Sequence, residues 1–431
     1  MNGVLLLMVG VAFAFASWRQ LTWVAVAGAA APMELLSKAM IEAASGAVTL
    51  AIGLVGVMTL FMGLMKVAEA GGMLRIIARL IRPLMVRLFP DVPAEHPAMG
   101  AMILNLSANA LGLGNAATPF GIRAMQELDR LNSQPGTATN AMILFLAINT
   151  SSVTLLPTGV IALRAAAGSA SPAAILSTTL FATLGSTAVA ILMAKLLGRR
   201  LPGPAPLASP SQASAQDHHP IDSSLSALDG RPYPLWVGVA TLAGLLALVP
   251  AAVIYGQAVS PWIIPGLTVG FLAFGALRGI PVYESMVEGG KEGFQVALRI
   301  IPYMVVILVA VAMLRVSGAL DLLVSALGRF TAPLGLPAEA LPIALLRPLS
   351  GSGAYAVLAS LLADPAIGPD SYTGYLVSTF QGSTETTFYV LAVYFGAVQV
   401  RRIRYAMAAA LTADLAGVVC AVLACQYLYA R

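Results

Sequence analysis

The sequence predicts an all-α polytopic membrane protein made of two repeats of opposite orientation. Of its 431 residues, 58% are hydrophobic and only 10% are charged, whereas soluble proteins carry about 25% charged residues. Windows of roughly 18 or more mostly apolar residues recur, and a helix of that length crosses a bilayer. The same order of features also occurs twice. We expect about nine transmembrane helices, two re-entrant hairpins and several interfacial amphipathic helices.

The first unit, residues 1–197, combines apolar segments with a charged surface helix. Transmembrane helices are predicted at residues 3–18, 46–67, 138–156 and 173–197. Between the first two, Glu34, Lys38 and Glu42 recur every four residues. This spacing places them on one face, so we expect an interfacial helix at residues 33–44.

A basic amphipathic segment follows at residues 73–89, and we expect it to break at Pro83. Its arginines are Arg75, Arg79, Arg82 and Arg87. The pattern favours a helix on the cytoplasmic membrane surface. A specific lipid or partner site is the alternative.

Two apolar segments are interrupted by glycine-rich, polar sequence. Residues 97–111 run into a helix-breaking stretch at 112–119, and a second helix then continues to about residue 131. Residues 341–362 are interrupted at 347–353. Irregular backbone at membrane depth is tolerated only where it is buried in protein or faces water. Each segment is therefore predicted to form a re-entrant hairpin.

A polar linker at residues 198–234, rich in Pro, Ser and Ala, separates the units, and we expect it to be disordered. The second unit spans residues 235–431. Its transmembrane helices are predicted at 235–255, 261–278, 296–314, 372–395 and 406–429, with a turn at Ser260 and Pro261. Surface helices are predicted at 282–293 and 320–332.

Corresponding motifs follow the same order in the two units. Residues 105–107 (NLS) pair with 348–350 (PLS), and residues 149–154 (NTSSVT) pair with 381–386 (QGSTET). With the N-terminus in the cytoplasm, most Lys and Arg fall on the cytoplasmic side. The outer loops of the first unit keep only Arg19, Lys38 and Arg164. Equivalent segments then point in opposite directions, as in many secondary transporters.

The segment at residues 379–389 (TFQGSTETTFY) is the most polar part of an apolar span. Its Glu385 is expected to be buried, where a carboxylate is costly and is normally paired or functional. It contacts either a substrate or coupling ion, or a structural partner such as Arg347. Arg347 itself would hold an anionic substrate group or neutralise Glu385. Asp414, in the last span, serves either helix packing or proton or sodium coupling.

Polar side chains at the two tips and the two helix breaks complete the candidate substrate or ion-binding site. The tips carry Asn105, Ser107, Asn109, Asn115, Ser350 and Ser352, and the breaks carry Asn149, Thr150, Ser151, Gln381, Ser383 and Thr384. Half-helix termini and unwound carbonyl groups bind ions in transporters. The alternative is that these side chains only satisfy freed backbone groups.

Several function classes lack their motifs. The sequence has no Walker loop, zinc motif or Ser/His/Asp set, so neither an enzyme nor an ATP-driven pump is expected. Cys420 and Cys425 read as small apolar residues, and no cofactor or metal is expected. The net charge of +5 forms no nucleic-acid patch, so no nucleic-acid partner is expected.

The motifs resemble those of the spore maturation proteins, here joined in one chain. Residues 1–200 resemble the A protein through residues 105–119 and 149–152, and residues 235–431 resemble the B protein through 347–353 and 382–389. These proteins are grouped with the nucleoside-recognition or Gate domain. That domain also occurs in concentrative nucleoside transporters and in bacterial ferrous iron transporters. The resemblance implies a transport-type core with hairpins and supplies no substrate.

Together these observations predict a multi-pass protein of the inner (plasma) membrane with a cytoplasmic N-terminus and linker. It would move a small polar solute or lipid headgroup by alternating access, driven by a sodium or proton gradient. The alternatives are a non-transporting scaffold in envelope or spore-cortex maturation, and a channel-like pore. Membrane lipids are expected partners, and a homo-oligomer is left open.

Overall fold

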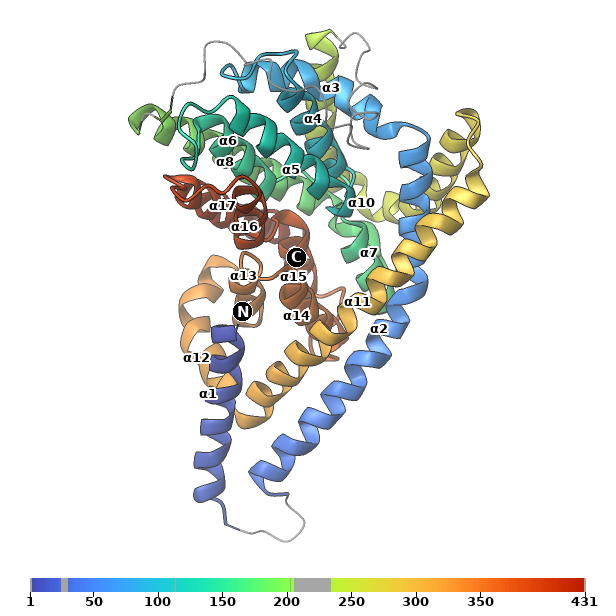
Figure 1. Ribbon diagram of the computed structural model, residues 1–431. Helices are drawn as coiled ribbons and strands as arrows, with labels where there is room; N and C mark the ends of the chain where they lie inside the picture. The colour runs from blue at the N-terminus through green and yellow to red at the C-terminus, as the bar shows by residue number, and fades with distance from the viewer. Residues whose placement is uncertain (1, 25–29, 113, 202, 205–233, 430–431) are drawn as a thin grey trace.

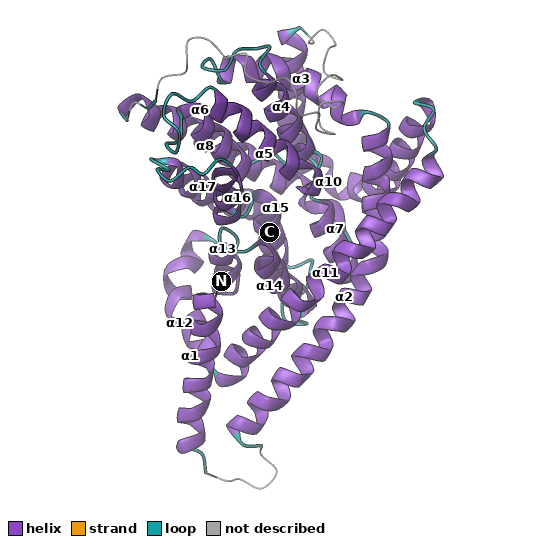
Figure 2. Ribbon diagram, in the orientation of Figure 1, coloured by secondary structure: helices purple, strands orange, loops and turns teal. Residues whose placement is uncertain are grey.

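The computed structural model describes residues 2–24, 30–112, 114–201, 203–204 and 234–429. These residues form helices joined by turns and loops (Figure 2). Within them, strand-like pairing is limited to an isolated bridge between Thr137 and Arg402. Most of the predicted 198–234 linker lies outside the described residues.

The helices of the first unit follow the order of its motifs. They are α1 (Asn2–Leu21), α2 (Pro32–Ala70), α3 (Met73–Leu88), α4 (Pro97–Ala110), α5 (Gly114–Arg130), α6 (Asn140–Thr150), α7 (Thr158–Ala166) and α8 (Leu176–Arg200). A 3₁₀ turn at Pro172–Ile175 precedes α8.

The helices of the second unit have matching counterparts from α11 onward. They are α10 (Leu235–Leu277), α11 (Val282–Ser317), α12 (Ala319–Thr331), α13 (Leu341–Leu346), α14 (Gly351–Ala363), α15 (Tyr372–Ser383), α16 (Thr387–Ala397) and α17 (Ala406–Tyr429). Each unit thus has a long helix, a surface helix, a helical hairpin, a broken helix pair and a closing helix.

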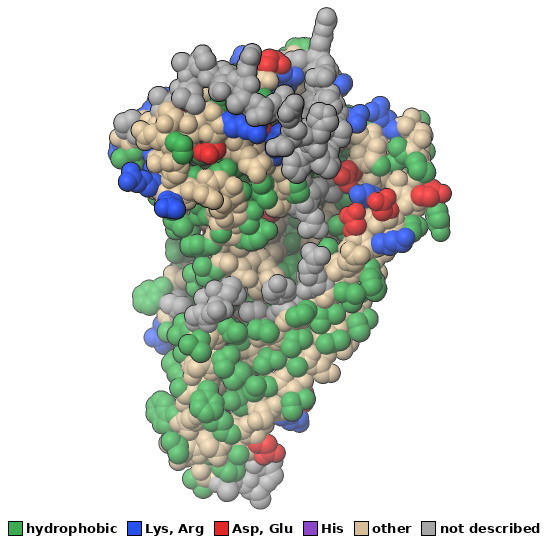
Figure 3. All heavy atoms as spheres, in the orientation of Figure 1, with side chains coloured by type: hydrophobic (Ala, Val, Ile, Leu, Met, Phe, Trp, Pro, Cys, Tyr) green, Lys and Arg blue, Asp and Glu red, His purple; other side chains and the backbone are tan. Residues whose placement is uncertain are grey.

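Two described helices are long and apolar enough to cross a membrane, Pro172–Arg200 and Ala406–Tyr429. Val55–Ala70 and Met73–Leu88, bent by 67°, would together make a third. The chain is therefore a helical membrane protein, and the number of nine spans stays a prediction. In Figure 3, hydrophobic side chains cover the face formed by α1, α2 and α11, and charged side chains gather toward the end that holds α3.

Two predicted boundaries are wrong, because segments expected to be separate form single helices. The surface helix at 33–44 and the span at 46–67 are both part of α2, and 282–293 and 296–314 are both part of α11. One glycine between two helical patterns costs only about 1 kcal/mol, which does not stop a helix. In α2, Lys38 and Glu42 remain exposed and paired at 3.8 Å.

The predicted turn at 260–261 is also absent, since α10 continues through it. Pro83 likewise lies inside α3 without breaking it. A helical proline removes one backbone hydrogen bond and kinks the helix, and the surrounding bonds are enough to continue it.

The long helices α2 and α11 run side by side and antiparallel (Figure 1). Their register is visible at glycines: a Cβ on Gly289 would lie 2.5 Å from Met62 O, and one on Gly293 would lie 2.7 Å from Met58 O. Glycine is needed at these positions because the two backbones approach so closely.

The closing helices α8 and α17 are antiparallel as well. At one end, Arg404 donates to the carbonyl oxygens of Ala138 and Leu201. At the other end, the Tyr429 hydroxyl donates a 2.7 Å bond to Ala174 O. We call these the Arg404 end and the Arg164 end of the molecule, the second because Arg164 lies there.

The two largest hydrophobic cores are built from both units. One combines residues of α4, α5 and α6 with residues of α16 and α17. The other combines α7 with α14 and α15. The two units are therefore held together by hydrophobic cores to which both contribute. The broken helices meet between these cores.

Candidate functional site

The two helix breaks meet at the centre of the molecule. The Glu385 N–H of one break donates a 2.8 Å hydrogen bond to Thr150 O of the other. Each break is also bonded to the tip of its own unit, through Leu155 N to Ala110 O at 2.9 Å and Phe388 N to Pro348 O at 3.1 Å. The structure thus brings together the two tips and two breaks that the sequence singled out.

An amide cluster joins the first tip to the first break. Asn109 Nδ2 donates to Asn149 Oδ1 at 2.9 Å, and the Tyr394 hydroxyl donates to the same oxygen at 3.4 Å. Asn105 Nδ2 donates to Ala117 O at 2.7 Å and to the Tyr394 hydroxyl oxygen at 3.0 Å. Because Tyr394 belongs to α16, this cluster also ties the first unit to the second.

Arg347 fastens the second break. Its Nε donates to Gln381 O at 3.2 Å and its Nη1 to Thr386 Oγ1 at 3.0 Å, while Nη2 lies 3.6 Å from Glu385 Oε2. The Arg347 side chain is only 8% exposed, and all three of its nitrogens face this segment. Arg347 therefore acts mainly to stabilise the unwound backbone of the second break through these hydrogen bonds.

The expectation that Glu385 is buried is wrong, since 47% of its side chain is exposed. It lies between α15 and α16, where the backbone is extended and no neighbouring helical turn covers the side chain. A partly hydrated carboxylate beside a buried arginine keeps free acceptor capacity.

Other predicted site residues bond to nearby backbone. Ser107 donates to Ile103 O at 2.7 Å, and Ser350 caps α14 by accepting from Gly353 N at 3.0 Å. Thr150 and Ser151 both donate to Ala147 O, at 3.0 and 2.8 Å. Ser383 donates to Phe380 O at 3.2 Å. Such bonds satisfy backbone groups near the breaks. This is the structural alternative to ion or substrate binding that the sequence left open for these residues.

Three predicted residues contribute less defined contacts. Ser352 lies half-buried in the first turn of α14, and Thr384 is buried with its methyl group toward Gly417. Asn115 lies in the first turn of α5 rather than in the tip, which ends before Gly114. The side chain of Asn115 is outside the described residues.

Asp414 is buried in α17, as the sequence predicts. It is 5% exposed, and its Oδ2 accepts a 2.7 Å bond from the Thr387 hydroxyl at the start of α16. Its other oxygen, Oδ1, has no hydrogen-bond partner among the described residues.

A row of hydroxyl groups on α8 was missed in the sequence. It consists of Thr178, Thr179, Thr183, Ser186 and Thr187. The hydroxyl oxygens of Thr178 and Thr379 are 2.8 Å apart, Ser186 donates to Ala413 O at 2.7 Å, and Thr187 donates to Ser151 O. Their spacing of three to four residues within an apolar span was the available signal.

Arg164 was assigned to an outer loop, and it is instead fully buried in α7. It donates to Pro369 O at 2.6 Å and lies 3.1 Å from Asp370 Oδ1, with its guanidinium 4.4 Å from the centre of the Tyr375 ring. These bonds cross between the units and hold the Arg164 end together.

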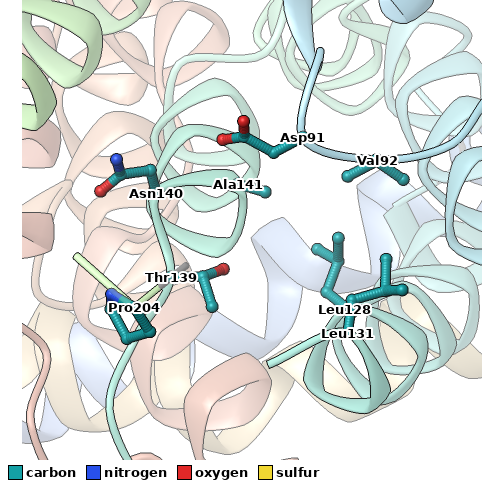
Figure 4. A pocket seen from close by; sticks show the side chains of 8 residues that line it. All are labelled: Asp91, Val92, Leu128, Leu131, Thr139, Asn140, Ala141 and Pro204. Carbon is teal, nitrogen blue, oxygen red and sulfur yellow. The ribbon is translucent and has the colours of Figure 1, made fainter. Parts of the chain in front are cut away.

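One surface cavity lies near the Arg404 end, away from the breaks. Its volume is about 20 Å³. Figure 4 shows Asp91, Thr139 and Asn140 among the side chains that line it. That volume suits a single water molecule rather than a solute. Among the described residues, no group of three or more His, Cys, Asp or Glu side chains is placed to hold a metal ion.

Comparison with protein families gives one match. A family model described as Gate, nucleoside recognition, matches residues 51–167 and 297–401, about half of the chain. The two matched stretches cover corresponding parts of the two units, and each includes one tip and one break.

Two curated proteins of Bacillus subtilis (strain 168) are similar to different parts of the chain. Spore maturation protein B is 46% identical over 166 residues, which cover 38% of this chain and 92% of that protein. Spore maturation protein A is 47% identical over 158 residues, which cover 37% of this chain and 81% of that protein. The chain therefore joins a relative of each in one polypeptide.

Proposed function

The chain belongs to the nucleoside-recognition Gate family, and on that basis we propose that it is a membrane transporter. It moves a small polar solute or lipid headgroup by alternating access, coupled to a sodium or proton gradient. The observation that carries the proposal is the hydrogen bond between Glu385 N and Thr150 O, because it joins two unwound segments at the middle of a helical membrane protein.

The arrangement of the helices supports two inverted-topology repeats. The pairs α2 with α11 and α8 with α17 are antiparallel. The breaks after α6 and α15 approach each other from opposite ends of the molecule. In transporters of this type, two such units rock against each other around a site between them.

The solute would bind as a donor to Glu385. Arg347 already bonds Gln381 O and Thr386, so its charge is committed to the protein, whereas the Glu385 carboxylate is half exposed. A hydroxyl or amine group on the solute would complete its hydrogen bonding. Nucleosides carry such groups and match the description of the family model, so they are the first probes.

The membrane orientation follows from the basic residues. Arg404 contacts Leu201, directly after Arg199 and Arg200, and Arg278 bonds Gly71 O just before the arginines of α3. We place these groups on the cytoplasmic side of the plasma membrane, together with the N-terminus, following the positive-inside rule.

The alternative is a scaffold in envelope or spore-cortex maturation that transports nothing. Its support is the names of the two relatives, which are both spore maturation proteins. A scaffold does not require a half-exposed carboxylate where the two breaks meet. The effect of substituting Glu385 therefore discriminates between the two functions.

The test begins with purified protein and a thermal-shift screen of nucleosides, amino acids, short peptides and lipid phosphates. Uptake of each stabilising compound is then measured in proteoliposomes for the wild type, Glu385→Gln and the control Glu95→Gln. Glu95 is a surface carboxylate paired with Arg82 at 3.1 Å. We expect Glu385→Gln to abolish uptake while Glu95→Gln retains it. Normal uptake by Glu385→Gln would refute the site, and no uptake of any compound by the wild type would favour the scaffold.

A further inference from the structure

Asp414 is a buried carboxylate that the proposed solute contact does not use. One of its oxygens accepts from Thr387, and the other is buried without a partner among the described residues. Over the same part of the chain, Asp414 forms no ion pair. An ionised carboxylate in such a position lacks both the water and the close counter-charge that would stabilise it.

The surroundings of Asp414 are tightly packed and hydroxyl-rich. Ser186 donates to the carbonyl of the preceding residue, Ala413, at 2.7 Å. One turn further along α17, a Cβ on Gly417 would lie 2.8 Å from Thr384 Cγ2 and 3.4 Å from Ser186 Oγ. These contacts place α8 and the second break directly against α17 on both sides of Asp414 in the sequence.

The helices packed against α17 are α6, α8, α15 and α16. Their titratable or charged residues, with those of the neighbouring break and of α17 itself, are Lys195, Arg199, Arg200, Tyr372, Tyr375, Glu385, Tyr389, Tyr394, Cys420, Cys425, Tyr427 and Tyr429. Arg347 is the cation connected to Asp414 through Thr386 and the adjacent Thr387, and its nitrogens are directed at Gln381, Thr386 and Glu385. No second carboxylate is bonded to Asp414 among the described residues, so it would titrate by itself.

We infer that Asp414 binds a proton and is the residue through which a proton gradient drives the transport proposed above, on which this inference rests. In the binding step, an O–H bond forms at Oδ1 while an O–H bond of a hydronium ion breaks, which leaves water and a neutral carboxylic acid. Release is the reverse: the O–H bond at Oδ1 breaks and the proton returns to water as hydronium. A proton needs only this one oxygen atom, whereas sodium would need several ligands.

A short chain of contacts connects Asp414 to the solute contact. Thr387 bonds Asp414, the adjacent Thr386 accepts from Arg347, and Arg347 lies beside Glu385. Protonation changes the acceptor strength of Asp414 toward Thr387 and therefore the position of the first turn of α16. The proton site and the solute site thus act on the same unwound segment.

The test is infrared spectroscopy of the purified full chain, which reports the C=O stretch of a protonated carboxyl group during a pH titration. We expect a titrating carboxyl band that disappears in Asp414→Asn and persists in Glu385→Gln. Thr387→Val keeps the carboxyl group and removes its donor, so it should shift the band, and this variant serves if Asp414→Asn does not fold. A band unchanged in either the Asp414 or the Thr387 variant would overturn the inference.

A sodium site would give a different result. Sodium chloride, compared with choline chloride at equal ionic strength, would then raise the thermal stability of the wild type and not of Asp414→Asn, and this outcome would also overturn the inference. The infrared measurement needs no solute, so it can detect the proton site even if the protein transports none of the tested compounds. Conversely, uptake by a protein without an Asp414 carboxyl band would refute the proton site alone.

Discussion

The N–H of Glu385 and the carbonyl oxygen of Thr150 are 235 residues apart in sequence and form a hydrogen bond of 2.8 Å. Both groups were released from helical bonding where α6 and α15 end. Each satisfies the other, and the bond therefore fixes the two breaks against each other. Any movement of one unit relative to the other must strain or break it, which makes its surroundings the most informative place for mutation.

Thr386→Val should destabilise the protein. The substitution removes the hydroxyl oxygen that accepts from Arg347 Nη1 at 3.0 Å and leaves a buried guanidinium N–H without that partner. The expected loss is about 1–3 kcal/mol, measured by thermal or denaturant unfolding in detergent. Thr154→Val is the matched control in the other break, because among the described residues the Thr154 hydroxyl bonds only Ser152 O, at 3.3 Å. Equal effects of the two variants would contradict the role of Arg347 in stabilising the second break.

Asn149→Ala should cost more stability than Tyr394→Phe. Asn149 accepts from Asn109 at 2.9 Å and from Tyr394 at 3.4 Å, and its own Nδ2 donates to Phe145 O at 3.0 Å. Its removal leaves several buried groups unpaired, at about 1–3 kcal/mol each before relaxation. Tyr394→Phe removes one hydroxyl and keeps the ring stacked near Phe145. The reverse order in unfolding experiments would show that the tyrosine, not the amide, organises this cluster.

Gly112→Ala should disturb the first tip. Gly112 has φ +77°, which side chains other than that of glycine adopt rarely, and a Cβ there would lie 2.5 Å from Leu156 O of the first break. We expect a loss of about 1–3 kcal/mol and reduced solute binding. Gly46→Ala is the control, since nothing lies within 4 Å of its Cβ position in α2. It should range from no effect to a gain of about 1 kcal/mol. A neutral Gly112→Ala would mean that the tip rearranges freely.

Asp370→Asn should destabilise the Arg164 end. Arg164 is fully buried, and its carboxylate partner lies 3.1 Å away. Loss of that charge leaves a buried guanidinium with neutral acceptors only, at about 1–3 kcal/mol because Asp370 itself is partly hydrated. The double variant Arg164→Met/Asp370→Asn should be more stable than Asp370→Asn, because no unpaired charge remains buried. A double variant less stable than Asp370→Asn would point to the hydrogen bonds of Arg164 instead of its charge.

Cysteines at Arg401 and Ala366 should be labelled from opposite sides of the membrane. Arg401 is exposed and donates its N–H to Gly136 O at the Arg404 end, while Ala366 is exposed in the loop after α14, near the Arg164 end. Both substitutions are made in a chain lacking Cys420 and Cys425 and are tested with a membrane-impermeant maleimide. We expect Arg401→Cys to react only from the cytoplasmic side. Labelling of both sites from the same side would exclude the inverted-repeat topology.

The helix breaks could be predicted from composition alone. Residues 149–154 and 381–386 place polar side chains inside apolar segments, and residues 112–119 and 347–353 add glycine and proline. Glycine and proline are unfavourable inside a helix, and polar side chains at membrane depth favour a segment that is buried in protein or faces water, so these stretches indicated an interruption. Long uninterrupted helices were harder to predict. Charged residues in α2 and α11 look like boundaries in the sequence, although helical hydrogen bonding continues past them.

The sequence determined that this protein is a helical membrane protein with polar interruptions inside its apolar segments. Tertiary structure decided which polar side chains are hydrogen-bonded within the protein and which keep an exposed group that can bind a solute. Arg347 and Glu385 looked like equivalent buried charges, and only packing shows the first hydrogen-bonded to the backbone and the second half exposed. Arg164 looked like a loop residue and is buried between the units. The reason is physical: side-chain composition sets the cost of leaving water, whereas the contacts that offset this cost come from residues hundreds of positions away.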